Sequence, residues 1–313
     1  MGKRLVDRYG RRIDYLRISV TDRCNLRCFY CMPPSGVQKV PRQEMLKYEE
    51  IIEIVKIARD LGISKFRITG GEPLVRKGIV GFMEKLAKLE IDFSLTTNGM
   101  LLNKYARDLL NAGLSRINIS LDTLNESRFN WITCGGNIID VFSGIDAARK
   151  LNFSSIKINV VVMRGINDDE IMDFVEWGEK EILNIRFIEF MHLSGEDYFY
   201  SLKPVIDKLV RDKELVSVKV SGSGPAKSFR SKDKGNITGF ILPRSEPFCK
   251  ECNRLRLTSS GVLLPCLFSG DGIDLKEALR GGGDVESLFC EAVSFKPEKH
   301  NLNGVENYQY MNW

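Results

Sequence analysis

The sequence predicts an α/β fold: an incomplete (β/α)6 TIM-like barrel followed by a smaller C-terminal domain. Short β-branched runs alternate with segments of helical period from Tyr15 to Tyr200, which is the pattern of parallel βαβ units. Six such units are too few for the usual closed barrel of about eight strands. Several polar motifs directly follow the expected strands, and the carboxyl ends of parallel strands are where chemistry gathers.

Each expected element follows from its local pattern. A helix over Glu49–Leu61 has one apolar face and ends at Gly62, and another over Asn103–Ala112 ends at Gly113. The local patterns are also compatible with a doubly wound sheet, so the barrel is favoured by the number of units. The expected strands are Tyr15–Val20, Lys65–Thr69, Phe93–Thr97, Arg116–Leu121, Ile156–Val162 and Ile185–Phe190.

The bulk composition is that of an ordinary soluble globular protein. Of the 313 residues, 43% are hydrophobic and 28% are charged. Met1 to Tyr15 is not a charged-then-apolar leader, and no apolar run reaches the length of about 18 residues that a membrane span needs, so we expect a cytoplasmic protein. The excess of Lys and Arg over Asp and Glu, 46 − 41 = 5, suits an anionic small molecule as well as nucleic acid.

A change in composition suggests two domains. The stretch "SGSGPAKS", Ser221 to Ser228, is rich in Gly and Ser and predicts a boundary or loop. We therefore expect a barrel over residues 1–222 and a smaller domain over 223–313. The last stretch, Pro297 to Trp313, is polar, and no element is expected there.

Three cysteines in C-x3-C-x2-C spacing, Cys24, Cys28 and Cys31, form the most informative motif. In a reducing compartment, closely spaced thiols are more often metal ligands than disulfides, and thiolates select zinc or iron–sulfur clusters. A structural zinc needs a fourth ligand, and the next residues, Met32 to Pro34, offer none. A four-iron cluster held by three thiolates instead leaves one iron open. Cys134 and Cys290 stand alone, and each is expected to be a small buried or idle thiol.

This loop resembles the radical S-adenosylmethionine (SAM) superfamily, in which an aromatic residue precedes the third cysteine, as Tyr30 does here. "TGGEP", with Gly70 to Pro73 after a strand, supports the resemblance, since two glycines let a ligand approach the backbone. In that superfamily SAM chelates the open iron, and an electron from the cluster releases a 5′-deoxyadenosyl radical. The resemblance therefore implies cofactor-based radical chemistry.

A second group, Cys249, Cys252 and Cys266, has C-x2-C-x13-C spacing and again three thiols. A zinc ribbon is the plain structural alternative, but no further Cys or His lies at suitable spacing. Arg254 and Arg256 lie beside these cysteines, and an i, i+2 pair on a strand projects both side chains to one face. Arg binds phosphate strongly. We therefore interpret the two arginines as a binding site for an anionic substrate, next to a second cluster held by the three cysteines.

Across most of the chain, from Asp7 to Asp274, the sequence is similar to the GTP 3′,8-cyclases of the molybdenum cofactor biosynthesis protein A family. The matching motifs are "LRISVTDRCNLRCFYCMP", "KFRITGGEPLVR", "LTTNG", "RINISLDTL", "INVVVMRGINDDEI", "IRFIEFM" and "GFILPRSEPFCKECNRLRLTSSGVLLPCLFS". The resemblance implies a lyase that converts GTP to (8S)-3′,8-cyclo-7,8-dihydroguanosine 5′-triphosphate, the first step of molybdopterin synthesis.

The resemblance also implies cofactors, partners and site residues. It implies two [4Fe-4S] clusters, each with three Cys ligands, SAM, an unidentified electron donor, a homodimer, and transfer of the product to cyclic pyranopterin monophosphate synthase. No membrane or nucleic-acid partner and no catalytic side chain beyond the cluster-bound SAM are expected. The SAM contacts implied are Tyr30, Gly71, Ser120 and Met191. The GTP contacts implied are Arg17, Arg67, Thr96, Lys157, Arg254, Leu255 and Arg256, with Lys65 and Arg186 on the phosphate side.

Two other interpretations stay open at this point. A radical SAM peptide-maturing enzyme would usually carry more C-terminal cysteines and would not need the Arg254 and Arg256 pair. A zinc-bound nucleic-acid-binding module would be colourless and would hold no iron. Members of the resembled family typically end in two glycines, whereas this sequence stops at Tyr310 to Trp313, so we expect a peptide ending in Gly-Gly to stimulate product formation.

Overall fold

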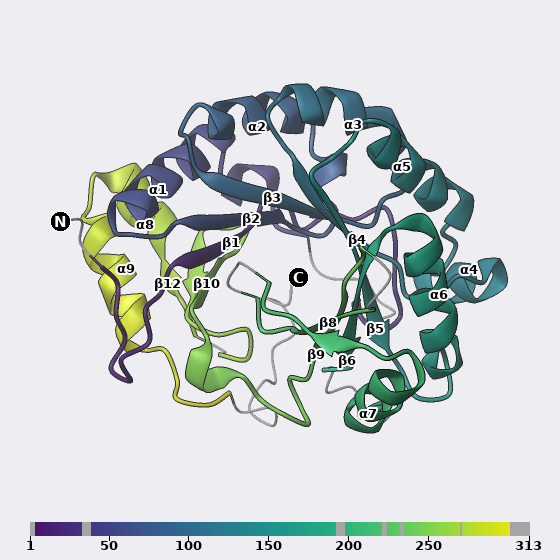
Figure 1. Ribbon diagram of the computed structural model, residues 1–313. Helices are drawn as coiled ribbons and strands as arrows, with labels where there is room; N and C mark the ends of the chain where they lie inside the picture. The colour runs from purple at the N-terminus through teal and green to yellow at the C-terminus, as the bar shows by residue number, and fades with distance from the viewer. Residues whose placement is uncertain are drawn as a thin grey trace.

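The computed structural model describes residues 4–32, 39–191, 198–220, 224–231, 235–269 and 271–300. Its centre is a curved sheet in which six parallel strands follow one another in chain order (Figure 1). These strands are β1 (Tyr15–Ser19), β2 (Lys65–Thr69), β3 (Asp92–Thr97), β4 (Arg116–Ser120), β5 (Ser155–Val162) and β6 (Asn184–Glu189). The six predicted strands are confirmed, each to within one residue at either end.

Helices cover the outer face of this sheet (Figure 1). Two of them match the predicted helices but begin and end one residue earlier. After each of these two helices the chain reverses direction at a glycine with positive φ, Gly62 at 93° and Gly113 at 91°. The helices are α1 (Tyr48–Asp60), α2 (Ile79–Ala87), α3 (Leu102–Asn111), α4 (Glu126–Thr133), α5 (Ile138–Lys150), α6 (Ile171–Glu181), α7 (Lys203–Asp212), α8 (Leu275–Gly281) and α9 (Val285–Ser294).

The C-terminal region extends the same sheet at both edges. Strand β9 pairs in parallel with β6, and β10 pairs in parallel with β1, so eight parallel strands lie side by side. The added strands are β7 (Val216–Ser217), β8 (Lys227–Arg230), β9 (Thr238–Ile241), β10 (Arg254–Leu257), β11 (Val262–Leu264) and β12 (Ile273–Asp274). The sheet order runs from β12 to β7 without closing, which confirms the predicted incomplete barrel. The division at residues 222 and 223 stays a prediction.

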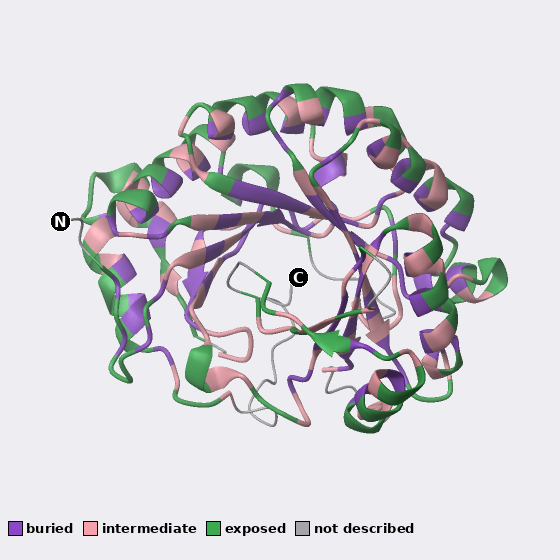
Figure 2. Ribbon diagram, in the orientation of Figure 1, coloured by how far each residue is buried: buried purple, intermediate pink, exposed green. Residues whose placement is uncertain are grey.

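The two faces of the sheet differ in polarity. In β5, Ile156, Ile158, Val160 and Val162 are buried in the core that the helices cover. The alternate residues, such as Lys157, are only half-buried. Figure 2 shows the same division, with buried segments along the strands and exposed ones on the outer sides of the helices. The period of two along each strand therefore places a polar lining inside the barrel.

Within the described residues, no helix is both long and apolar enough to cross a membrane. Three features of the sequence fall outside the described residues: His192, the first part of the Gly- and Ser-rich stretch at residues 221–223, and the C-terminal residues 301–313.

Candidate active site

One cavity of about 310 Å³ lies inside the barrel, where the loops after the parallel strands meet. Both cysteine groups line it, although more than 200 residues separate them in the sequence. All eight cysteines of the chain are free thiols, so none of these six is used in a disulfide. In the described part of the chain, no three Cys, His, Asp or Glu side chains gather tightly enough for a single metal ion. The cysteines that line the cavity are Cys24, Cys28, Cys31, Cys249, Cys252 and Cys266.

The first cysteine loop is held by backbone hydrogen bonds to the end of α4. The amide of Arg27 donates to the carbonyl of Thr133 at 3.1 Å, and that of Phe29 donates to Ile132 at 3.0 Å. Burial, followed by the charges of Cys31 and Asp122, raises the pKa of the Cys28 thiol well above its ordinary value. Three half-buried thiols on one turn are a donor set that fits an iron–sulfur cluster, since a bound cation would stabilise their thiolates.

The glycines of "TGGEP" pack against this loop. A Cβ atom on Gly71 would lie 2.5 Å from the carbonyl oxygen of Arg23, and one on Gly70 would lie 2.7 Å from that of Thr21. The amide of Gly71 also donates to the carbonyl of Thr21 at 2.7 Å. The glycines are therefore required for the close approach of the cysteine loop itself, in addition to lining the cavity.

Two buried carboxyl groups that the sequence reasoning did not single out organise the same end of the cavity. Glu72 accepts hydrogen bonds from Thr97 Oγ1 at 2.8 Å and from the amide of Asn98 at 2.6 Å, and burial raises its pKa to about 7. Asp122 accepts from the Tyr30 hydroxyl at 2.5 Å, and burial raises its pKa to about 6. Both lie in motifs that are visible in the sequence, "TGGEP" and "SLD". In the sequence alone, however, a single acidic residue cannot be distinguished from an ordinary surface charge.

The residues implied for SAM binding, Tyr30, Gly71, Ser120 and Met191, all line the cavity. Tyr30 comes from the cysteine loop, Ser120 from the end of β4, and Met191 from the loop after β6. Gly71 follows β2, so the four positions reach the cavity from four different strands. No contact to SAM is tested by this placement, so their role stays a prediction.

At the other end of the cavity, β10 presents two arginines. Arg254 and Arg256 line the cavity, whereas the Leu255 side chain between them is buried in the hydrophobic core. Arg17 lines the cavity as well and stands beside Arg256 in the register of β1 and β10. Thr96, at the end of β3, also lines it. Arg17 Nε and Arg254 Nε are buried with no hydrogen-bond partner among the described residues, so these groups suit an anionic ligand.

A further set of cations lies on the barrel strands around Tyr15. Arg67 Nε donates to the Tyr15 hydroxyl at 2.9 Å. Burial alone would raise the pKa of Tyr15, but the charges of Arg67, Arg17 and Arg254 lower it to about 8. Burial and then the charge of Arg186 lower the pKa of Lys157, also to about 8. Four of the residues implied for GTP are not among those that line the cavity: Lys65, Arg67, Lys157 and Arg186.

This set of cations has no counter-charge in the described part of the chain. No Asp or Glu there forms an ion pair with Arg17, Arg67, Lys157, Arg186, Arg254 or Arg256. Half-buried cations that repel one another are costly unless an anion joins them. The barrel interior is therefore electrostatically matched to a multiply charged anion.

Residues near the C-terminal end of the described chain lie beside the second cysteine group. His300 Nδ1 lies 2.9 Å from Cys249 Sγ, although 51 residues separate them. Lys296 also lines the cavity and is buried. Burial would raise the pKa of Cys252, but the charges of Lys296 and Arg254 lower it. Sequence spacing gave no signal for His300 or Lys296, because each meets the cysteines only through the fold.

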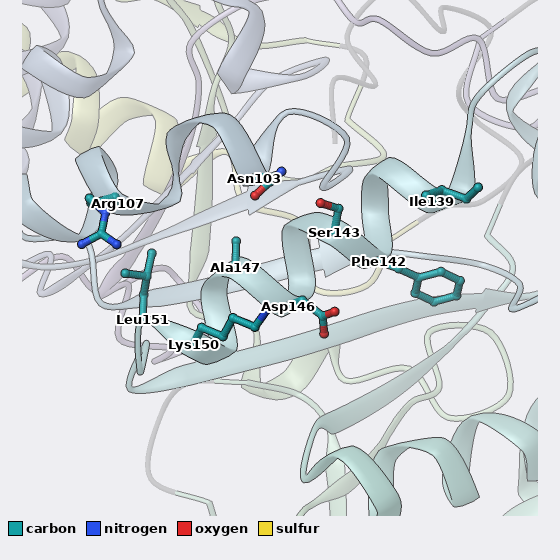
Figure 3. Close-up of a pocket in the computed structure, with 9 residues that line it drawn as sticks. All are labelled: Asn103, Arg107, Ile139, Phe142, Ser143, Asp146, Ala147, Lys150 and Leu151. Carbon is teal, nitrogen blue, oxygen red and sulfur yellow. The ribbon is translucent and has the colours of Figure 1, made fainter.

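A second hollow of about 580 Å³ lies on the outer side of the barrel, between α3 and α5 (Figure 3). It contains none of the residues predicted for the site. It is lined by Asn103, Arg107, Ile139, Phe142, Ser143, Asp146, Ala147, Lys150 and Leu151.

Comparisons with known proteins agree with this geometry. A family model for the radical SAM superfamily matches residues 18–178, and a model for Molybdenum Cofactor Synthesis C matches residues 183–302. A GTP 3′,8-cyclase of Thermodesulfovibrio yellowstonii is 49% identical over 93% of this chain and 94% of its own. A GTP 3′,8-cyclase of Petrotoga mobilis is 45% identical over 95% of each chain.

Solved structures confirm the fold. SuiB of Streptococcus suis bound to S-adenosylmethionine superposes with a TM-score of 0.62 and 18% identity, over 92% of this chain and 69% of that one. The barrel and its first cysteine loop define a radical SAM protein, and membership of that superfamily implies a [4Fe-4S] cluster and SAM. Within the superfamily, the chain belongs to the GTP 3′,8-cyclase family.

Proposed function

We propose that this chain is a GTP 3′,8-cyclase that converts GTP to (8S)-3′,8-cyclo-7,8-dihydroguanosine 5′-triphosphate, the first step of molybdenum cofactor synthesis. The observation that carries the proposal is the single cavity with three thiols at each end and unpaired arginines beside the second group. The names of the relatives supply the reaction.

Two [4Fe-4S] clusters fit the two thiol groups, and when bound they would supply the one-electron chemistry that side chains lack. Cys24, Cys28 and Cys31 would hold the cluster that the superfamily implies. Cys249, Cys252 and Cys266 would hold the second cluster. Each set has three thiols, which would leave one iron of each cluster open to a ligand.

At the first centre, the chain would hold SAM with residues from three loops and from the end of β4. Tyr30, Gly71, Ser120 and Met191 line this end of the cavity and would contact SAM. Asp122 would fix the Tyr30 ring through its 2.5 Å hydrogen bond, and Glu72 would fix the loops after β2 and β3. These two carboxyl groups preorganise the side chains that meet the ligand.

At the second centre, the chain would bind GTP by charge. Arg17, Arg254 and Arg256, together with Thr96, would contact the nucleotide in the cavity. Lys65, Arg67, Lys157 and Arg186 would neutralise the triphosphate from the barrel strands, where a low dielectric constant strengthens the attraction. Leu255 would act through its buried side chain, which fixes the strand that aims both arginines the same way.

The remaining parts of the proposal concern partners and location. The product would pass to cyclic pyranopterin monophosphate synthase, and the chain would work as a homodimer in the cytoplasm with an electron donor that is not identified. The division into domains 1–222 and 223–313 belongs to the same proposal. The product's recipient and the homodimer rest on the sequence resemblance, whereas the domain division and the location rest on the composition of the sequence.

Anaerobic reconstitution with iron and sulfide tests the proposal. The reconstituted protein should contain about eight iron atoms per chain. With SAM, a reductant and GTP, it should release 5′-deoxyadenosine and a cyclised nucleotide that mass analysis identifies. Formation of 5′-deoxyadenosine with unaltered GTP would contradict the cyclase assignment and leave the superfamily assignment intact.

A further inference from the structure

Lys296, which follows α9, is a buried lysine that the proposed reaction does not use. Its relative exposure is 2%, and it is among the largest fully buried side chains. Its Nζ donates to the carbonyl oxygens of Arg254 and Pro265, each at 2.7 Å. Burying an ammonium group is costly unless it is hydrogen-bonded and its charge is compensated. Both carbonyls are neutral, so they satisfy its donors without compensating its charge.

The two carbonyls belong to the segments that carry two of the second group's cysteines. Arg254 lies two residues after Cys252, and Pro265 immediately precedes Cys266. Against the effect of burial, the charge of Lys296 also lowers the pKa of the Cys252 thiol. One side chain therefore joins the backbone of β10 to the loop after β11, beside the thiols of both segments.

The backbone around Lys296 is itself fixed by the N-terminal part of the chain. Arg11, paired with Asp7 at 2.5 Å, donates to the carbonyl of Pro297 at 2.7 Å and to that of Cys249 at 2.6 Å. His300 then lies against the Cys249 thiol at 2.9 Å. The segment 296–300 is thus anchored at both ends over the second cysteine group, which keeps the Lys296 side chain in place.

We propose that Lys296 is the positioning residue of the second three-cysteine centre. It fixes the two segments that carry Cys252 and Cys266 relative to each other and places a positive charge beside their thiolates. This inference rests on the proposed second cluster. Positive charge and hydrogen bonds near the sulfur ligands of a cluster favour its reduced, more negative state. Lys296 therefore raises the reduction potential of the second centre and slows the loss of its iron.

The test compares Lys296→Met, Lys296→Gln and Lys296→Arg in the full reconstituted chain. Spectroscopic redox titration follows each centre, and the signal of the second centre is the one lost in Cys266→Ser. We expect Lys296→Met to lower the potential of the second centre only, and to release its iron to a chelator about ten- to a hundredfold faster. Lys296→Gln keeps a donor without the charge, so it should lower the potential similarly with a smaller effect on iron release. Lys296→Arg should restore the potential.

Lys276→Met is the matched control, because Lys276 pairs with Glu44 at the surface of the same region at 2.5 Å. It should change neither centre. Unchanged potential and iron release in both Lys296→Met and Lys296→Gln would overturn the proposal, and so would an equal shift of both centres. A wild-type protein that binds about four iron atoms would overturn the second cluster itself, and the inference with it. Normal clusters with no cyclised product would contradict only the proposed function.

Discussion

The two cysteine groups offer the same number of thiols but are built in different ways. Cys24, Cys28 and Cys31 lie on one loop, and neutral backbone contacts with α4 and the glycines of "TGGEP" hold that loop. Cys249, Cys252 and Cys266 are spread over a longer stretch, and cationic side chains surround them. The first group therefore depends on close packing, whereas the second depends on charges brought in from the rest of the fold.

The largest expected effect separates the two centres by function. Cys28→Ala removes a ligand of the first centre, and we expect 5′-deoxyadenosine and the cyclised nucleotide both to fall to background. Cys266→Ala should abolish the cyclised nucleotide while 5′-deoxyadenosine still forms. Chromatography of both products measures this difference, and Cys290→Ala, which changes an exposed free thiol, is the control. Loss of 5′-deoxyadenosine in both variants would contradict a division of labour between the centres.

The next effect concerns the charge at the second group. Arg254→Ala removes an arginine whose Nε is buried without a partner. Since a hydrogen bond to a charged group contributes about 1.5–3 kcal/mol, the dissociation constant for GTP should rise roughly ten- to a hundredfold. Equilibrium binding of GTP and of SAM measures the effect, and SAM affinity should not change.

Arg280→Ala is the matched control for this charge, because Arg280 forms an exposed ion pair with Glu50 at 2.7 Å. It should leave GTP affinity unchanged, since exposed ion pairs contribute little even to stability. Equal GTP affinity in Arg254→Ala and the wild-type protein would contradict the placement of β10 in the substrate site.

A third prediction addresses the packing of the first group. Gly71→Ala places a Cβ atom 2.5 Å from the backbone oxygen of Arg23, so the cysteine loop must move. We expect the free energy of unfolding to fall by about 1–3 kcal/mol, and iron to be lost from the first centre only. Gly81→Ala in α2 is the control, because its Cβ meets nothing within 4 Å. That change should raise the free energy of unfolding by about 0.5–1 kcal/mol. Similar stability for both variants would show that the loop adapts.

The sequence could predict whatever depends on neighbouring residues. Short β-branched runs between helical segments located the barrel strands, and the strand period of two placed Arg254 and Arg256 on one face. The first cysteine group is local, so its spacing was visible directly. Glu72 and Asp122 were visible only as isolated acids, because burial, which changes their pKa values, is a property of the folded chain.

The surroundings of the second cysteine group could not be predicted in the same way. Arg11 meets Cys249 across 238 residues, and Lys296 meets Arg254 across 42. Contacts at such separations depend on β10 pairing with β1, which no local period encodes. The sequence reasoning also gave Leu255 a substrate contact, whereas its side chain lies in the core. Alternation along a strand would have indicated this, since its neighbours on both sides face the cavity.

The smallest expected effect is a dependence of GTP binding on pH, which arises from titratable groups among the barrel cations. Tyr15 and Lys157 both have a pKa of about 8. Above that pH, Tyr15 gains a negative charge and Lys157 loses a positive one, so both changes weaken the attraction for the triphosphate. Titration calorimetry should show the dissociation constant for GTP rising severalfold between about pH 7.5 and 9.5, with protons taken up on binding.

Tyr15→Phe and Lys157→Arg separate the two contributions. Tyr15 faces Arg17, Arg67, Arg254 and Arg256, and the charge of Tyr15 also reaches Lys157 and Arg186. Each substitution should remove part of the rise, because Phe cannot ionise and Arg keeps its proton throughout this range. The double variant should show little change in GTP affinity between pH 7.5 and 9, because Arg186 and Arg256, whose pKa values burial lowers to about 10, stay mostly protonated there. If the dissociation constant for GTP still rises with pH in the double variant, the titrating group lies elsewhere. That result would contradict the proposed attraction between the barrel cations and the triphosphate.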